Sequence, residues 1–214
     1  MHIIDDFLKD PYQVRGLALS SNLERQPESY NWPGYRSHIP ASFASSYLKK
    51  LKSVLNEELE FKYAYFQSIG EKWVAGAYHA DLFCKWTALT FLNINPPLNS
   101  GIEVGEVQTE EYTASIFENG QQDVNTFDSS MHLFNVSEKN PIQKFFFERK
   151  LKEYNSHYKN SCVVSNKFNR TVIFRGNRTH CAQNFFGTKP SDSRLTIISF
   201  LCEPNNTEVL YPNQ

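Results

Sequence analysis

The sequence lacks a dominant charge, a long hydrophobic run and clustered cysteines. Its 22 Lys and Arg against 23 Asp and Glu give a net charge of −1, so no general basic field would attract nucleic acid. No apolar run approaches the roughly 18 residues of a membrane span. Residues 1–8 have neither the basic segment nor the long apolar segment of a signal peptide. We therefore expect a cytoplasmic protein without a membrane or nucleic-acid partner.

Cysteine is scarce, whereas aromatic residues are abundant. The four cysteines are widely spaced and form no C-x-x-C pair, which favours reduced, buried thiols over disulfides or a zinc cluster. An aromatic content of 14% suits a β-rich architecture. With 214 residues and 40% hydrophobic content, the chain can bury one substantial core. We expect a single domain over residues 1–214.

Helical patterns occupy much of the N-terminal region, residues 1–60. A short strand is expected at Ile3–Leu8. Asp10 followed by Pro11 is typical of a helix start, with the aspartate as N-cap. Apolar residues at helical spacing predict an amphipathic helix over Ala41–Leu59. Asn140 and Pro141 open a later helix, which extends to about Tyr158.

Strand-like patterns dominate the rest of the chain. Runs rich in aromatic and β-branched residues predict strands at 61–68, 72–79, 86–95, 100–107, 161–165, 171–175 and 194–202. Residues 108–140 are polar and show no clear periodicity. Together with the helix that follows, they are interpreted as an insertion or lid at about 108–158. The predicted fold class is therefore mainly β with flanking helices (α+β).

A loop at residues 31–37 combines Trp32, Tyr35 and Arg36 with Pro33 and Gly34. Proline and glycine predict the loop, but a solvated loop does not need two aromatic rings beside an arginine. Either the loop packs onto the core, or it forms a lip of a substrate pocket. Both interpretations stay open at this point.

An H-x-D sequence occurs at His79 and Asp81. Residues two apart on a strand point to the same face, so an imidazole and a carboxylate can reach one point. A distant His180 would complete two histidines and one carboxylate, the facial triad of non-haem Fe(II) oxygenases. Taken alone, the three-residue motif is weak, and a hydrogen-bonded core or surface histidine explains it better.

Arg194 begins the apolar strand that ends at Cys202, and Thr196 shares its face. A buried arginine is costly unless it is paired, and its planar guanidinium suits bidentate binding of a carboxylate. The alternative is a salt bridge to one of the chain's own acidic residues, or a strand end that lies in solvent. The order of the motifs, H-x-D, then histidine, then arginine, favours an anion site.

This ordered set resembles the Fe(II)/2-oxoglutarate-dependent oxygenases, and most closely their prolyl-hydroxylase-like branch. The strand that ends in Phe91-Leu-Asn93 is similar to that branch's Tyr-Leu-Asn strand, and Phe174-x-Gly176-x-x-x-His180 is similar to its approach to the distal histidine. Ile4–Pro11, with Pro33–Arg36, resembles an uncharacterised oxygenase-like family of bacteria and phages. The cytoplasm would then be that of a bacterium or of an infected host.

The resemblance implies a double-stranded β-helix (jelly-roll) core. It also implies oxidative decarboxylation of 2-oxoglutarate with Fe(II) and O2, coupled to hydroxylation of a C–H bond in a protein side chain, peptide or small metabolite. By resemblance, His79, Asp81 and His180 bind iron, and a halogenase is disfavoured because Asp81 is present. The same resemblance implies that Arg194 and Thr196 bind 2-oxoglutarate. The remaining expected contacts are Asn93 and Tyr78 for the co-substrate, and Trp32, Tyr35 and Arg36 for the substrate.

Two features depart from the family pattern. Phe91 replaces a tyrosine that contacts 2-oxoglutarate in many prolyl hydroxylases, and Ser100-Gly-Ile-Glu103 replaces the usual Gly-Gly-Thr. A non-catalytic jelly-roll binding or structural module, such as a phage-particle protein, is the main alternative. A zinc hydrolase is less well supported, since the sequence has no H-E-x-x-H.

Overall fold

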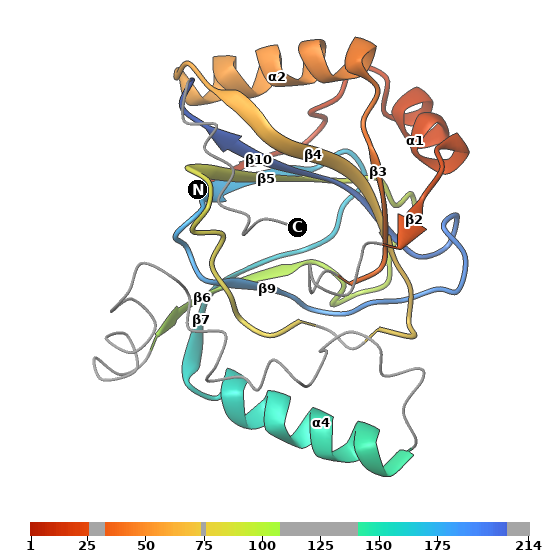
Figure 1. Cartoon of the computed structure of the whole chain (residues 1–214), viewed down its shortest axis with the longest axis vertical. Coiled ribbons are helices and arrows are strands. Elements are labelled where there is room, and N and C mark those ends of the chain that lie inside the picture. Colours follow the sequence, from red (N-terminus) through yellow and green to blue (C-terminus); the bar gives the residue numbers. More distant parts are fainter. Residues whose placement is uncertain (26–32, 74–75, 108–140, 205–214) are drawn as a thin grey trace, which may run out of the picture.

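The computed structural model describes residues 1–25, 33–73, 76–107 and 141–204. Two antiparallel sheets face each other (Figure 1). The larger has seven strands in the order β1 (His2–Ile4), β8 (Thr171–Arg175), β5 (Trp86–Phe91), β10 (Arg194–Cys202), β4 (Glu60–Ile69), β3 (Tyr35–His38) and β2 (Glu24–Arg25). The smaller has the order β7 (Tyr158–Val164), β6 (Ile102–Val107) and β9 (His180–Ala182). This arrangement is a jelly roll, and it confirms the predicted fold class.

Helices cover the outside of both sheets (Figure 1). α1 (Pro11–Ser20) and α2 (Ala41–Leu55) lie on the outer side of the seven-stranded sheet, and α4 (Pro141–Asn155) lies beyond the three-stranded sheet. The Asp10 carboxylate caps α1 by accepting a hydrogen bond of 3.0 Å from the Gln13 amide, as predicted. The predicted helix to Leu59 was too long by four residues, because Asn56 adopts a left-handed conformation and ends it.

The apolar core has two halves, one on each face of the seven-stranded sheet. The outer half joins α1 and α2 to the sheet through Tyr47, Leu51, Phe66, Leu195 and Ile197. The inner half fills the space between the two sheets with Leu89, Phe91, Ile102, Phe174, Ile198 and Phe200. Burial of this apolar surface on both faces holds β10, the central strand, from two sides.

Several predicted strand bounds were confirmed and others were wrong. β8 and β10 have the predicted bounds, whereas the first strand is confined to His2–Ile4 and β5 stops at Phe91 rather than Asn95. Residues 35–37 do not form a loop, since Tyr35–His38 pairs with β4 after Gly34 turns the chain. In the predicted strand 72–79, the described residues form no regular strand: Trp73 lies in a turn closed on Gly70, and His79 makes one isolated bridge.

The predicted division of the chain stays a prediction. Of the proposed insertion at 108–158, residues 108–140 lie outside the described residues, and 141–155 form α4. The single domain over 1–214 and the helical N-terminal region over 1–60 likewise remain expectations. Among the described helices, none combines the length and the hydropathy that crossing a membrane requires.

Candidate metal centre

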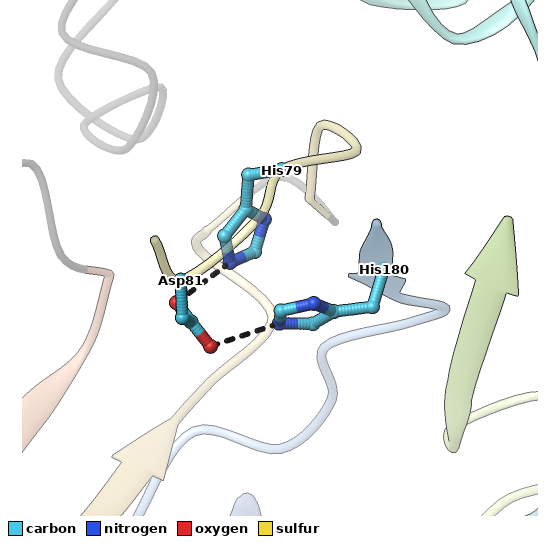
Figure 2. A group of neighbouring side chains, drawn as sticks. All are labelled: His79, Asp81 and His180. Carbon is cyan, nitrogen blue, oxygen red and sulfur yellow. Dashed lines mark ion pairs between the residues drawn. The ribbon is translucent and has the colours of Figure 1, made fainter. Parts of the chain in front are cut away.

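His79 and His180 lie side by side although 101 residues separate them in the sequence. Each donates its backbone N–H to the other's carbonyl, at 3.0 Å from His79 and 2.8 Å from His180. The two ring centroids are 4.3 Å apart. This reciprocal bridge fixes both backbones. The two imidazoles therefore lie close together, one on the first residue of β9 and the other on the segment before Asp81 (Figure 2).

Asp81 is fixed by a close approach to the turn that follows β8. Its amide donates to the Gly176 carbonyl at 2.7 Å, and the Gly176 amide donates to the Lys85 carbonyl at 3.0 Å. A Cβ atom at position 176 would lie 2.6 Å from the backbone carbonyl oxygen of Asp81 and 2.2 Å from that of Cys84. Glycine is therefore required at 176 for lack of space.

The three side chains converge on one point (Figure 2). His180 Nε2 lies 3.4 Å from Asp81 Oδ2, and His79 Nε2 lies 3.9 Å from Asp81 Oδ1. Each residue offers one ligand atom, and these atoms lie within 4.8 Å of one another. Two imidazoles and one carboxylate on one side of a cation match the donor set of a non-haem Fe(II) site. Asp81 and His180 are buried, whereas His79 is exposed.

Backbone carbonyls select which ring nitrogen of each histidine can bind a metal. His79 Nδ1 lies 3.0 Å from the Ala77 carbonyl, and His180 Nδ1 lies 2.9 Å from the Arg178 carbonyl. A carbonyl only accepts, so both Nδ1 atoms carry the proton and each Nε2 keeps its lone pair. Burial, and then the neighbouring His79, lower the pKa of His180 to about 4, which keeps this ring neutral at pH 7.

Arg194 is a buried cation with little to neutralise it. Its guanidinium Nε donates to the Ser100 carbonyl at 3.4 Å, and no carboxylate among the described residues pairs with it. Burial lowers its pKa to about 10, so it stays charged at pH 7. Thr196, on the same face, has a buried hydroxyl without a hydrogen-bond partner in the described portion of the chain. Unsatisfied buried groups of this kind call for a ligand, and an anion fits both.

Asn93 and Tyr78 have other partners in this structure. Asn93 donates to the Ser193 carbonyl at 2.7 Å and accepts from the Leu195 amide at 3.0 Å, so it holds the backbone on both sides of Arg194. The Tyr78 hydroxyl donates to Glu103 at 3.0 Å, and the ring stacks on Tyr158. Their direct contacts with a co-substrate stay predictions.

The predicted substrate residues fall on β3. Arg36 is buried, and its guanidinium lies 5.6 Å from the centre of the Tyr65 ring. In the register of the sheet, Arg36 pairs with Gln67, which pairs with Thr196. The Tyr35 hydroxyl accepts from Lys72 at 2.6 Å. Trp32 lies outside the described residues, and a substrate role for all three stays a prediction.

Sequence reasoning missed Thr87. Its hydroxyl donates to Asp81 Oδ2 at 2.7 Å, and both side chains are buried. The signal was available, since Thr87 is a polar residue near the start of an apolar strand, six residues after Asp81. Threonine is also a good strand former, which made its presence there unremarkable.

Comparisons with known proteins give a result for structure only. No family model matches the sequence, and no curated protein matches it. Solved structures do match. A prolyl hydroxylase from Trichoplax adhaerens, in complex with a hypoxia-inducible-factor peptide fragment, is 11% identical, with a TM-score of 0.52, over 99% of this chain and 87% of that one.

Two further structures are similar to the same degree. HygX from Streptomyces hygroscopicus, with nickel, 2-oxoglutarate and hygromycin B bound, is 11% identical, with a TM-score of 0.54, over 95% of this chain and 82% of that one. EctD from S. alaskensis, with 2-oxoglutarate and 5-hydroxyectoine, is 13% identical, with a TM-score of 0.54, over 100% of this chain and 77% of that one. At these identities the likeness shows the fold, which is the one that the resemblance implied.

Proposed function

We propose that the chain is an Fe(II)- and 2-oxoglutarate-dependent oxygenase that hydroxylates a C–H bond. One observation carries the proposal: His79, Asp81 and His180 converge on one point, and Arg194, which pairs with no carboxylate among the described residues, borders the same apolar cluster. The Phe174 ring lies against His180 and the Phe91 ring against Arg194, and both rings belong to the cluster between the sheets. The cluster suits Fe(II), and the arginine suits the carboxylate of a 2-oxo acid. The similar structures of HygX and EctD hold 2-oxoglutarate, which supports the same co-substrate here.

The chain's own residues would divide the work. Fe(II), when bound, would supply O2 activation coupled to the decarboxylation of 2-oxoglutarate to succinate. His79 and His180 would donate their Nε2 lone pairs, and Asp81 would bring one negative charge. Arg194 would bind the distal carboxylate of the co-substrate. Apolar side chains, among them Leu89, Phe174 and Ile198, would keep water from the buried side of the centre, where Asp81 and His180 lie.

Phe91 alters how the co-substrate carboxylate would be held. The Arg194 guanidinium carbon lies 5.5 Å from the centre of the Phe91 ring, which offers no hydroxyl. The free hydroxyl of Thr196 lies on the same face of β10 and can donate to the carboxylate instead. We therefore assign the anion site to Arg194 and Thr196 together, with Phe91 as a packing surface for the guanidinium.

Anaerobic titration tests the proposal. Purified protein receives Fe(II) and then 2-oxoglutarate, and a visible charge-transfer band is expected when both bind. On admission of O2, succinate should form, and a pooled library of peptides and metabolites should contain a substrate that accelerates it. If no band and no succinate appear, the oxygenase proposal is wrong and the jelly-roll binding module gains support. Zinc retained through purification, in place of iron, would favour the hydrolase.

Asp81→Ala should abolish Fe(II) binding, because it removes the only carboxylate of the cluster. The matched control is Glu58→Ala, which removes an exposed carboxylate from the turn after α2 and should bind Fe(II) like the wild type. Equal Fe(II) affinity in Asp81→Ala and wild type would place the metal elsewhere.

A further inference from the structure

The two carboxylate oxygens of Asp81 have different surroundings. Oδ2 accepts the hydrogen bond of 2.7 Å from the Thr87 hydroxyl and lies 3.4 Å from His180 Nε2. Oδ1 lies 3.9 Å from His79 Nε2. No hydrogen bond to Oδ1 is found among the described residues. The carboxylate is therefore held by one oxygen and left open at the other.

Thr87 is well placed to act as a rigid donor. Its side chain is fully buried, and its strand β5 is paired on one side with β8 and on the other with β10. A β-branched side chain on a strand between two partners has little rotational freedom. The thiol of Cys84, which is also buried, lies 3.5 Å from the Thr87 hydroxyl.

We propose that Thr87 is a positioning residue that makes Asp81 a ligand through one oxygen. A facial triad needs its carboxylate to occupy a single coordination position, so that three positions stay open for co-substrate and O2. By engaging Oδ2, the Thr87 hydroxyl leaves Oδ1 as the oxygen offered to the metal. Outer hydrogen bonds of this kind orient ligands and tune the affinity of a site. The inference rests on the proposed Fe(II) site.

The test uses Co(II) under anaerobic conditions, because its visible spectrum reports coordination number without turnover. Thr87→Val keeps the shape of the side chain and removes the hydroxyl, whereas Thr87→Ser keeps the hydroxyl. We expect Thr87→Val to bind Co(II) about 10- to 100-fold more weakly, the usual cost of losing such a partner, with an altered d–d spectrum. Thr87→Ser should restore both affinity and spectrum.

Thr90→Val is the matched control on the same strand. Thr90 is also fully buried, but its hydroxyl bonds to Tyr47 and Thr171 on the outer face. This variant should lose stability and keep the wild-type Co(II) affinity and spectrum. Should Thr87→Val fail to fold, Thr87→Ser and Thr87→Ala provide a second pair that differs by one oxygen.

The outcomes separate the two proposals. Wild-type affinity and spectrum in Thr87→Val would overturn the positioning role while the metal site stands. Equal losses in Thr87→Ser and Thr87→Val would also overturn it, because they would show a packing role. If the wild-type protein binds neither Co(II) nor Fe(II), the proposed function itself fails, whatever the Thr87 variants do.

Discussion

The two faces of β10 are equally buried and differ in charge. On the outer face, Leu195, Ile197 and Leu201 pack in the apolar cluster with the helices, and Ser199, the polar residue of that face, is buried and neutral. On the inner face, Arg194 and Thr196 are buried to the same extent, yet they have few or no partners in the described chain. Burial alone therefore does not separate core from site. The distinguishing feature is the buried charge of Arg194, which has no counter-charge among the described residues.

This difference between the faces affects the stability of the fold. A buried cation without a counter-charge lowers stability, and an apolar residue of similar volume is often better for the fold. Strained or unsatisfied groups persist at sites where a ligand uses them. Under the proposed function, the inner face would give up some stability in exchange for ligand binding, whereas the outer face contributes to stability. Variants on the outer face should change mainly the free energy of unfolding, and variants on the inner face mainly the affinity for 2-oxoglutarate.

The largest expected effect is on the outer face. Ile197→Ala removes a fully buried side chain and should lower the free energy of unfolding by about 3 kcal/mol, as the lost apolar burial and the resulting cavity predict. Urea unfolding measures it, and Ile197→Val should cost about 1 kcal/mol. The folded variant should keep wild-type affinity for 2-oxoglutarate. A selective loss of that affinity would mean that the faces are coupled.

Arg194→Met should have the opposite pattern. Removing the guanidinium should weaken 2-oxoglutarate binding about 30-fold, near 2 kcal/mol, the usual worth of a hydrogen bond to a charged group. The free energy of unfolding should stay the same or rise, because a buried charge is lost. The control, Arg175→Met, removes an arginine from the outer Glu57 ion pair. An unchanged 2-oxoglutarate affinity in Arg194→Met would remove the arginine from the proposed site.

The smallest effect on stability is expected at Asp5, whose carboxylate is partly exposed and paired with Arg170 and Lys167. Arg170 and Lys167 hydrogen-bond to Asp5 and hold the pKa of this carboxyl well below its usual range. Because the folded pKa is depressed, the contribution is present above the unfolded value of about 4 and is lost as the pH falls below it. Solvent screens the site, so Asp5→Asn should cost less than about 1 kcal/mol at pH 7.

Thermal unfolding of Asp5→Asn at pH 7 and at pH 3 measures this contribution. The difference between variant and wild type should shrink at the lower pH, because the Asp5 carboxyl of the unfolded wild type takes up a proton there while the folded carboxylate keeps its charge. A cost above that of Ile197→Ala would contradict the ranking, because it would give a half-exposed ion pair more weight than buried apolar area.

The strands with continuous apolar runs were predictable, and the contacts between them were not. β8 and β10 were found at the predicted residues because β-branched and apolar residues make up most of each strand. His79 was expected on a strand, but it lies outside regular structure, and its place depends on the bridge to His180. No local pattern encodes a contact across 101 residues. The order of the motifs, through its resemblance to a family, was the signal that joined them.

Three further differences between the sequence-based predictions and the structure depend on local geometry that the sequence does not show. Gly176 was noted only as part of the motif that leads to His180, because the neighbours that leave no room for a Cβ atom at position 176 come from distant segments of the chain. Thr87 looked like an ordinary strand former, because the partner of its hydroxyl is known only once Asp81 is placed. Asn56 ended α2 early through a left-handed conformation, which competes with an apolar pattern that continues to Leu59.

The bridge between His79 and His180 has a consequence for the order of folding. In the unfolded chain, a metal ion would find His79 and Asp81 close together, but His180 only after closing a loop of about 100 residues, at an entropic cost of about 4 kcal/mol. The bridge between His79 and His180 must therefore form before all three side chains of the candidate site can reach one metal ion. A metal ion would therefore bind late in folding, and it would shift the equilibrium toward the folded state by mass action. Full metal affinity would then be found only in chains that have completed folding.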